Sequence, residues 1–78
     1  MKNIIAVCES GWILVGVQTE ETDKKITLNS ASVVRRWTNG KGVGGLAKKE
    51  NISEYTLDEI GAVDIFKSKI LFTIPCEW

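Results

Sequence analysis

The residues best suited to chemistry lie between Arg35 and Glu50, in the segment R-R-W-T-N-G-K-G-V-G-G-L-A-K-K-E. This segment combines two arginines and a tryptophan with four glycines inside six residues. Guanidinium groups hold phosphate bidentately, and glycines let backbone N–H groups approach an anion closely. An indole can stack on a planar base beside such charges. The segment therefore predicts a site for an anionic, planar ligand, and a small nucleotide fits this description best.

Each residue type of the predicted site has its own expected role. Arginine and lysine side chains would neutralise phosphate, glycines would offer backbone N–H groups, and Trp37 would stack a base. On a regular strand Arg35 and Trp37 share one face and Arg36 points to the other, so one arginine would serve a given site. The alternative is a solvated loop with Trp37 in the core. The predicted ligand-binding residues are Arg35, Arg36, Trp37, Thr38, Asn39, Gly40, Lys41, Gly42, Gly44 and Gly45.

The glycines from Gly40 to Gly45 match the pattern G-x-G-x-x-G, but the surrounding sequence argues against a dinucleotide-binding fold. That fold needs a strand before the motif, a full helix after it and a second parallel strand. Here Asn51 and Ser53 interrupt any helix soon after the motif. No G-K-[ST] follows, which also excludes a P-loop.

The formal net charge of zero conceals two oppositely charged stretches. Seven of the ten cations lie between Lys24 and Lys49, where no acidic residue occurs, and five carboxylates without a cation lie between Glu50 and Asp64. The acidic stretch counts against nucleic-acid binding. It could instead pair with the basic stretch of a neighbouring copy, so we expect a homo-oligomer.

Catalysis has little support in this composition. The chain has no histidine, so no obvious general base is present. Cys8 and Cys76 are expected to be buried thiols, and no C-x-x-C pair suggests zinc. We therefore expect a non-enzyme with no catalytic residue, no metal and no cofactor.

The pattern of apolar residues predicts one all-β domain over 1–78, a small open barrel or sandwich of five to seven short strands. The first three strands should form a meander, with Gly16 at a bulge or a close-approach point, and one short helix should follow the glycine-rich loop. Asp58–Gly61 and Lys67–Lys69 are predicted turns. No apolar run is long enough for a membrane helix, which predicts a cytoplasmic protein. The expected strands cover 4–8, 12–19, 25–29, 31–37, 55–57, 62–66 and 70–74.

Four segments together resemble a family of short uncharacterised β-proteins encoded by phages and prophages. They are G-W-I-L-V-G from Gly11, I-T-L-N-S-A-S-V-V-R-R-W from Ile26, G-V-G-G-L-A from Gly42 and I-L-F-T-I-P-C from Ile70. The resemblance implies a protein acting in an infected bacterial host. By analogy of size and site, it suggests a protein that sequesters a cyclic nucleotide or a cyclic ADP-ribose-like signal of antiviral defence. The alternative is an inhibitor that binds a host defence protein, as anti-CRISPR proteins do, or an accessory part of the virion.

Overall fold

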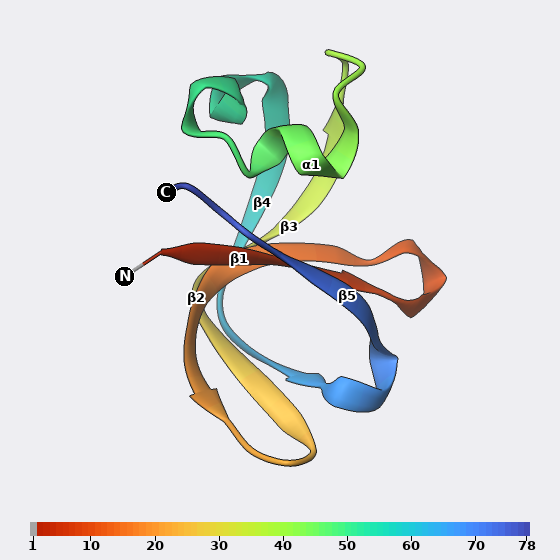
Figure 1. Ribbon diagram of the computed structural model, residues 1–78, viewed down its shortest axis with the longest axis vertical. Helices are drawn as coiled ribbons and strands as arrows, with labels where there is room; N and C mark the ends of the chain where they lie inside the picture. Colours follow the sequence, from red (N-terminus) through yellow and green to blue (C-terminus); the bar gives the residue numbers. More distant parts are fainter. Residues whose placement is uncertain (1) are drawn as a thin grey trace.

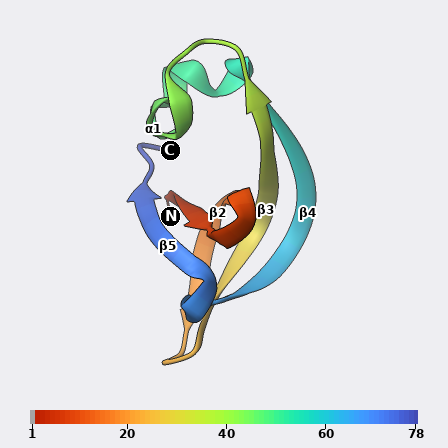
Figure 2. The same cartoon turned by 90° about the vertical axis from the view of Figure 1, so that its right-hand side faces the viewer.

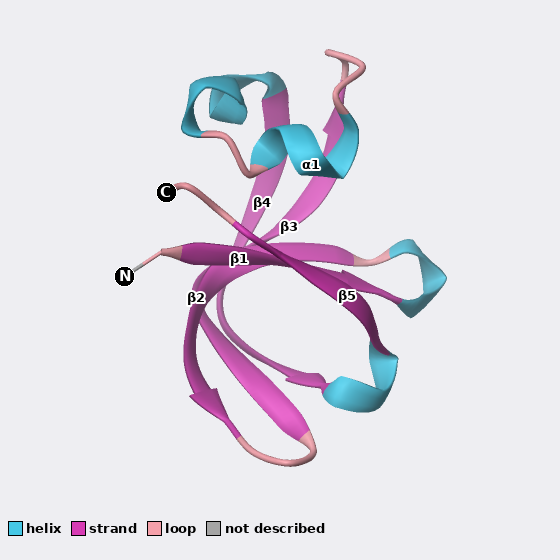
Figure 3. Ribbon diagram, viewed as in Figure 1, coloured by secondary structure: helices cyan, strands magenta, loops and turns pink. Residues whose placement is uncertain are grey.

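A computed structural model describes residues 2–78. It has five antiparallel strands, one short α-helix and three short 3-10 turns (Figure 1, Figure 3). The predicted all-β fold with minor helix is confirmed. In chain order the elements are β1 (Asn3–Cys8), η1 (Glu9–Gly11), β2 (Ile13–Glu21), β3 (Lys25–Trp37), α1 (Gly42–Leu46), η2 (Lys49–Glu54), β4 (Tyr55–Phe66), η3 (Lys67–Lys69) and β5 (Ile70–Pro75).

The strands form one curved, open sheet in the order β4-β3-β2-β1-β5. The predicted meander of the first three strands is confirmed, and the last strand returns to pair with the first. Consecutive strands β4 and β5 therefore lie at opposite edges, joined through η3 (Figure 2). Because the sheet is strongly curved, its edge strands β4 and β5 lie on either side of one concave face (Figure 2).

Two pairs of predicted strands are each one continuous strand. Segments 25–29 and 31–37 together make β3, and segments 55–57 and 62–66 together make β4. The predicted turn at Asp58–Gly61 is therefore wrong. Asp58 lies opposite Val33 in the β3–β4 ladder and its carboxylate forms an ion pair with Arg35 of β3. Gly61, at φ 80°, bends the strand without ending it. The predicted turn at Lys67–Lys69 is confirmed as η3.

Apolar side chains pack on both faces of this sheet. Along a strand, neighbouring side chains point to opposite faces, so Leu14 belongs to one cluster and Val15 to the other. This arrangement explains why the second strand reads as a nearly continuous apolar run. The groove-side cluster contains Ala6, Cys8, Leu14, Ile26, Leu28, Ala31, Val33 and Ile65. The helix-side cluster contains Ile5, Val15, Val34, Leu46, Ala47, Tyr55 and Cys76.

Gly16 lies at a close approach between β2 and β3. A Cβ at this position would lie 3.0 Å from the Ala31 Cα. The ladder register shifts between Val15 and Val17, which confirms the predicted bulge.

The two cysteines are free, buried thiols on opposite faces of the sheet. Burial raises the pKa of both the Cys8 and the Cys76 thiol. The prediction that they act as small buried hydrophobes is confirmed. Within residues 2–78 no helix has the length and apolar character to cross a membrane.

Asp64 joins the two longest strands and should contribute to stability in a pH-dependent way. Its carboxylate accepts hydrogen bonds from Thr27 Oγ1 at 2.6 Å and from Lys25 Nζ at 3.1 Å. These bonds, the one from Thr27 first, lower the pKa of Asp64. A carboxyl whose pKa is lower in the folded protein than in the unfolded chain stabilises the fold when the pH is above its pKa in the unfolded chain. This stabilisation is lost as the pH falls through its pKa in the folded protein.

We therefore expect the free energy of unfolding to decline below pH about 4. Asp64→Asn should flatten that decline in urea titrations across acidic pH. Glu59→Gln is the control, since Glu59 has no ion-pair partner among residues 2–78. An unchanged pH profile for Asp64→Asn would contradict the assignment.

Candidate functional site

The ten residues predicted to bind a ligand lie together at one end of the molecule. Arg35, Arg36 and Trp37 end β3, residues 38–41 form the following loop, and the last three glycines belong to α1. Figure 1 shows α1 next to the ends of β3 and β4. The predicted helix is confirmed, although it is only five residues long.

Arg35 and Trp37 lie on opposite faces, so the expectation that they share one is wrong. The ladder register shifts between Val34 and Arg36, and such a bulge breaks the alternation of side chains. Arg35 lies on the groove side, where its guanidinium is 2.8 Å from the Asp58 carboxylate. Trp37 packs against the helix-side cluster, with its ring centroid 5.8 Å from that of Tyr55. The indole and this guanidinium therefore do not form one clamp.

Polar groups of the glycine-rich loop bond to neighbouring residues of the same chain. Lys41 Nζ donates to Asn51 Oδ1 at 3.0 Å, and Asn51 Nδ2 donates to the Gly45 carbonyl at 2.8 Å. The Tyr55 hydroxyl donates to the Gly42 carbonyl. Because Asn51 and Tyr55 are buried, these bonds satisfy groups that would be costly to leave without partners.

Asn39 closes the loop in a similar way. Its Oδ1 accepts from the Lys41 backbone N–H at 2.9 Å, and its Nδ2 donates to Glu54 at 3.0 Å. Thr38, Gly40 and Arg36 are exposed. The loop thus acts first as the support that holds α1 over the sheet.

The C-terminal segment fastens the same helix from the other side. Trp78 Nε1 donates to the Leu46 carbonyl at 2.9 Å, and the Glu77 N–H donates to the Ala47 carbonyl at 2.8 Å. The Asn3 N–H donates to the Trp78 carbonyl at 2.6 Å, which connects this segment to β1. Leu46 is fully buried beneath these contacts.

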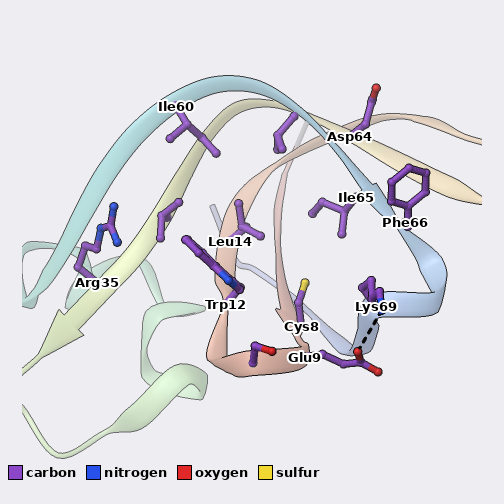
Figure 4. Close-up of a pocket in the computed structure, with 13 residues that line it drawn as sticks. Cys8, Glu9, Trp12, Leu14, Arg35, Ile60, Asp64, Ile65, Phe66 and Lys69 are labelled. Carbon is purple, nitrogen blue, oxygen red and sulfur yellow. Dashed lines mark ion pairs between the residues drawn. The ribbon is translucent and has the colours of Figure 1, made fainter.

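A more open site lies on the concave face, in a cavity of about 660 Å³ that we call the Trp12 groove (Figure 4). Three large apolar side chains around it remain exposed: Trp12 by 52%, Ile60 by 42% and Phe66 by 62%. Figure 4 shows the Trp12 indole in the middle of the opening, with Arg35 to one side and Phe66 and Lys69 to the other. The remaining lining residues are Cys8, Glu9, Ser10, Leu14, Val33, Val63, Asp64 and Ile65.

Charged side chains surround this apolar interior. Arg35 pairs with Asp58, and Lys69 Nζ lies 3.5 Å from the Glu9 carboxylate. All four side chains are more than half exposed, so a partner could compete for them at little cost. Of the ten predicted residues, Arg35 is the one that lines the Trp12 groove.

Sequence reasoning missed this groove because its residues come from β1, β2, β3, β4 and the turns next to them. The sequence indicates that Trp12 is a core or subunit-interface residue, since it follows a turn and starts an apolar strand. One sequence feature could have indicated the groove: Trp12 and Phe66 each lie beside a turn, where a large side chain can remain exposed to solvent. Within the part of the chain that the structure describes, no group of three or more His, Cys, Asp or Glu could hold a metal ion.

Comparison with known proteins gives no relative: no family model and no curated protein matches this chain.

Proposed function

We propose that the protein is a non-catalytic binding domain whose Trp12 groove receives apolar side chains of a partner protein. The observation that carries this proposal is the exposure of Trp12, Ile60 and Phe66 around an apolar interior. Exposed apolar side chains gathered around a groove are typical of interaction sites. Aromatic residues and arginine are also the types that dominate the binding energy of protein interfaces.

The charges around the groove would set the orientation of that partner. Glu9 and Lys69 lie at one side of the opening and Arg35 at the other (Figure 4). Peripheral charges of both signs favour a complementary protein surface, and they influence association rate and specificity more than affinity. Such a partner would be a host defence protein or a virion component, as the resemblance to phage proteins suggests.

Selection of ligands from a displayed peptide library tests the proposal directly. Selected peptides should carry apolar anchor residues, and Trp12→Ala should weaken their binding by about 30-fold, as expected for a residue worth about 2 kcal/mol. Thr56→Ala is the control, because Thr56 is exposed and lies outside both the groove lining and β5. Titration calorimetry gives the affinities. Equal losses in both variants would contradict the proposed site.

Nucleotide sequestration is a second proposal, and one feature of the groove favours it. Trp12 and Arg35 line the same cavity, so a base could stack on the indole while a phosphate displaces Asp58 from the guanidinium. The protein would then hold a linear or cyclic nucleotide signal in the groove through Trp12 and Arg35.

Native mass spectrometry with a mixture of linear and cyclic nucleotides separates the two proposals. A stoichiometric mass gain that Arg35→Ala abolishes would support sequestration. Lack of any gain, together with selected peptides that need Trp12, would support the protein-binding function instead.

A further inference from the structure

Strand β5 is an edge strand with unusual exposure of apolar side chains. Among residues 2–78 its only ladder is with β1 (Figure 2). Its first five residues, I-L-F-T-I, carry no charge, and Leu71 and Phe72 are 63% and 53% exposed. Every second residue of an edge strand presents its N–H and C=O groups away from its neighbour, as a template for a further strand.

The opposite edge strand, β4, carries the features that prevent such pairing, whereas β5 carries few of them. Strand β4 carries Asp58, Glu59 and Asp64, and Gly61, at φ 80°, bends it. Charges and bends are the devices by which proteins protect sheet edges. Strand β5 has neither a charge nor a glycine. Its register shift lies near its start, between Ile70 and Phe72, and Pro75 marks its end, so residues 72–74 are regular. Edge pairing is therefore favoured at β5 and opposed at β4.

We infer that two copies of this chain pair through β5, antiparallel around a two-fold axis with Phe72 opposite Phe72. In this register Leu71 faces Thr73 of the second copy on either side of the axis, so the strand complements itself over these residues. The register shift in β5 between Ile70 and Phe72 ends the regular pairing beyond Leu71. Aromatic pairs directly across an antiparallel ladder stabilise it. The two five-stranded sheets become one continuous sheet.

The existing ladder supports this register. Phe72 lies opposite Val7, which in turn lies opposite Ile13, so three apolar residues form a row across β5, β1 and β2. Pairing at Phe72 continues this row into the second copy.

A charge-swap experiment tests both the surface and the register. Wild-type protein should show a concentration-dependent doubling of mass in sedimentation velocity. Phe72→Lys and Phe72→Glu should each be monomeric, because like charges then face each other across the axis. An equimolar mixture of the two variants should regain the doubled mass, because opposite charges now meet. Glu59→Lys is the control, since Glu59 is exposed on the opposite edge strand β4, lies outside the Trp12 groove, and should leave the dimer intact.

Three results would overturn the inference: a monomeric wild type, a dimer that persists in Phe72→Lys, or a mixture that does not associate. Circular dichroism checks that both variants fold, which their exposed position favours. If either variant fails to fold, amide exchange of the wild type decides instead. Protection across 70–74 should increase with protein concentration, and concentration-independent exchange there would reject the pairing.

Discussion

Leu46→Ala is expected to lower the free energy of unfolding by about 3 kcal/mol. Leu46 is fully buried and is the residue through which α1 packs against the sheet. Its truncation leaves a cavity in the helix-side cluster and weakens the attachment of the whole glycine-rich loop. Urea unfolding followed by tryptophan fluorescence measures the loss, since Trp37 and Trp78 both pack against this cluster.

Ser53→Ala provides the control for this prediction. Ser53 is exposed and lies outside the helix-side cluster, so removing its hydroxyl should change stability by less than about 0.5 kcal/mol. A similar small effect for Leu46→Ala would show that α1 contributes little to the folded state.

Gly45→Ala is expected to destabilise the protein by about 2 kcal/mol, whereas Gly44→Ala should stabilise it by up to about 1 kcal/mol. A Cβ at Gly45 would lie 2.5 Å from both the Tyr55 hydroxyl and the Lys41 Cβ. The hydroxyl donates to the Gly42 carbonyl, so it cannot move without losing that bond. A Cβ at Gly44 meets nothing within 4 Å, and alanine favours the helix there. Thermal unfolding of the two variants measures both changes.

The opposite signs distinguish two roles for these neighbouring glycines. If Gly45 is needed for close packing, its variant loses stability whether or not a ligand is present. If both variants are equally stable but fail to bind a nucleotide, the glycines serve the ligand, and the packing explanation is wrong.

The strands and the all-β class could be predicted from the sequence, because alternating apolar residues indicate a half-buried strand and continuous apolar runs indicate a buried one. The errors arose where polar residues lie inside strands. Asp58 and Glu59 resemble a turn in sequence, yet the Asp58 carboxylate pairs with Arg35 on the adjacent strand. Such a partner is 23 residues away, and only the ladder brings the two together.

The candidate site was harder to predict, for a related reason. The composition of the loop suggests anion binding. It does not reveal that Asn51 of η2 and Tyr55 of β4 donate hydrogen bonds to the carbonyls of the glycine-rich segment. A bulge near Arg36 then separates Arg35 from Trp37, and a bulge has no reliable sequence signature there. The Trp12 groove depends on the curvature of the whole sheet, which local patterns do not encode.

The two thiols can report separately on local opening at each face of the sheet. Cys8 belongs to one apolar cluster and Cys76 to the other, and each is less than a tenth exposed. A thiol reagent can therefore reach each cysteine only when its own side of the sheet opens. Matching alkylation rates would mean that the sheet opens as one cooperative unit. Faster modification of Cys76 would mean that the α1 layer lifts away while the concave side stays closed.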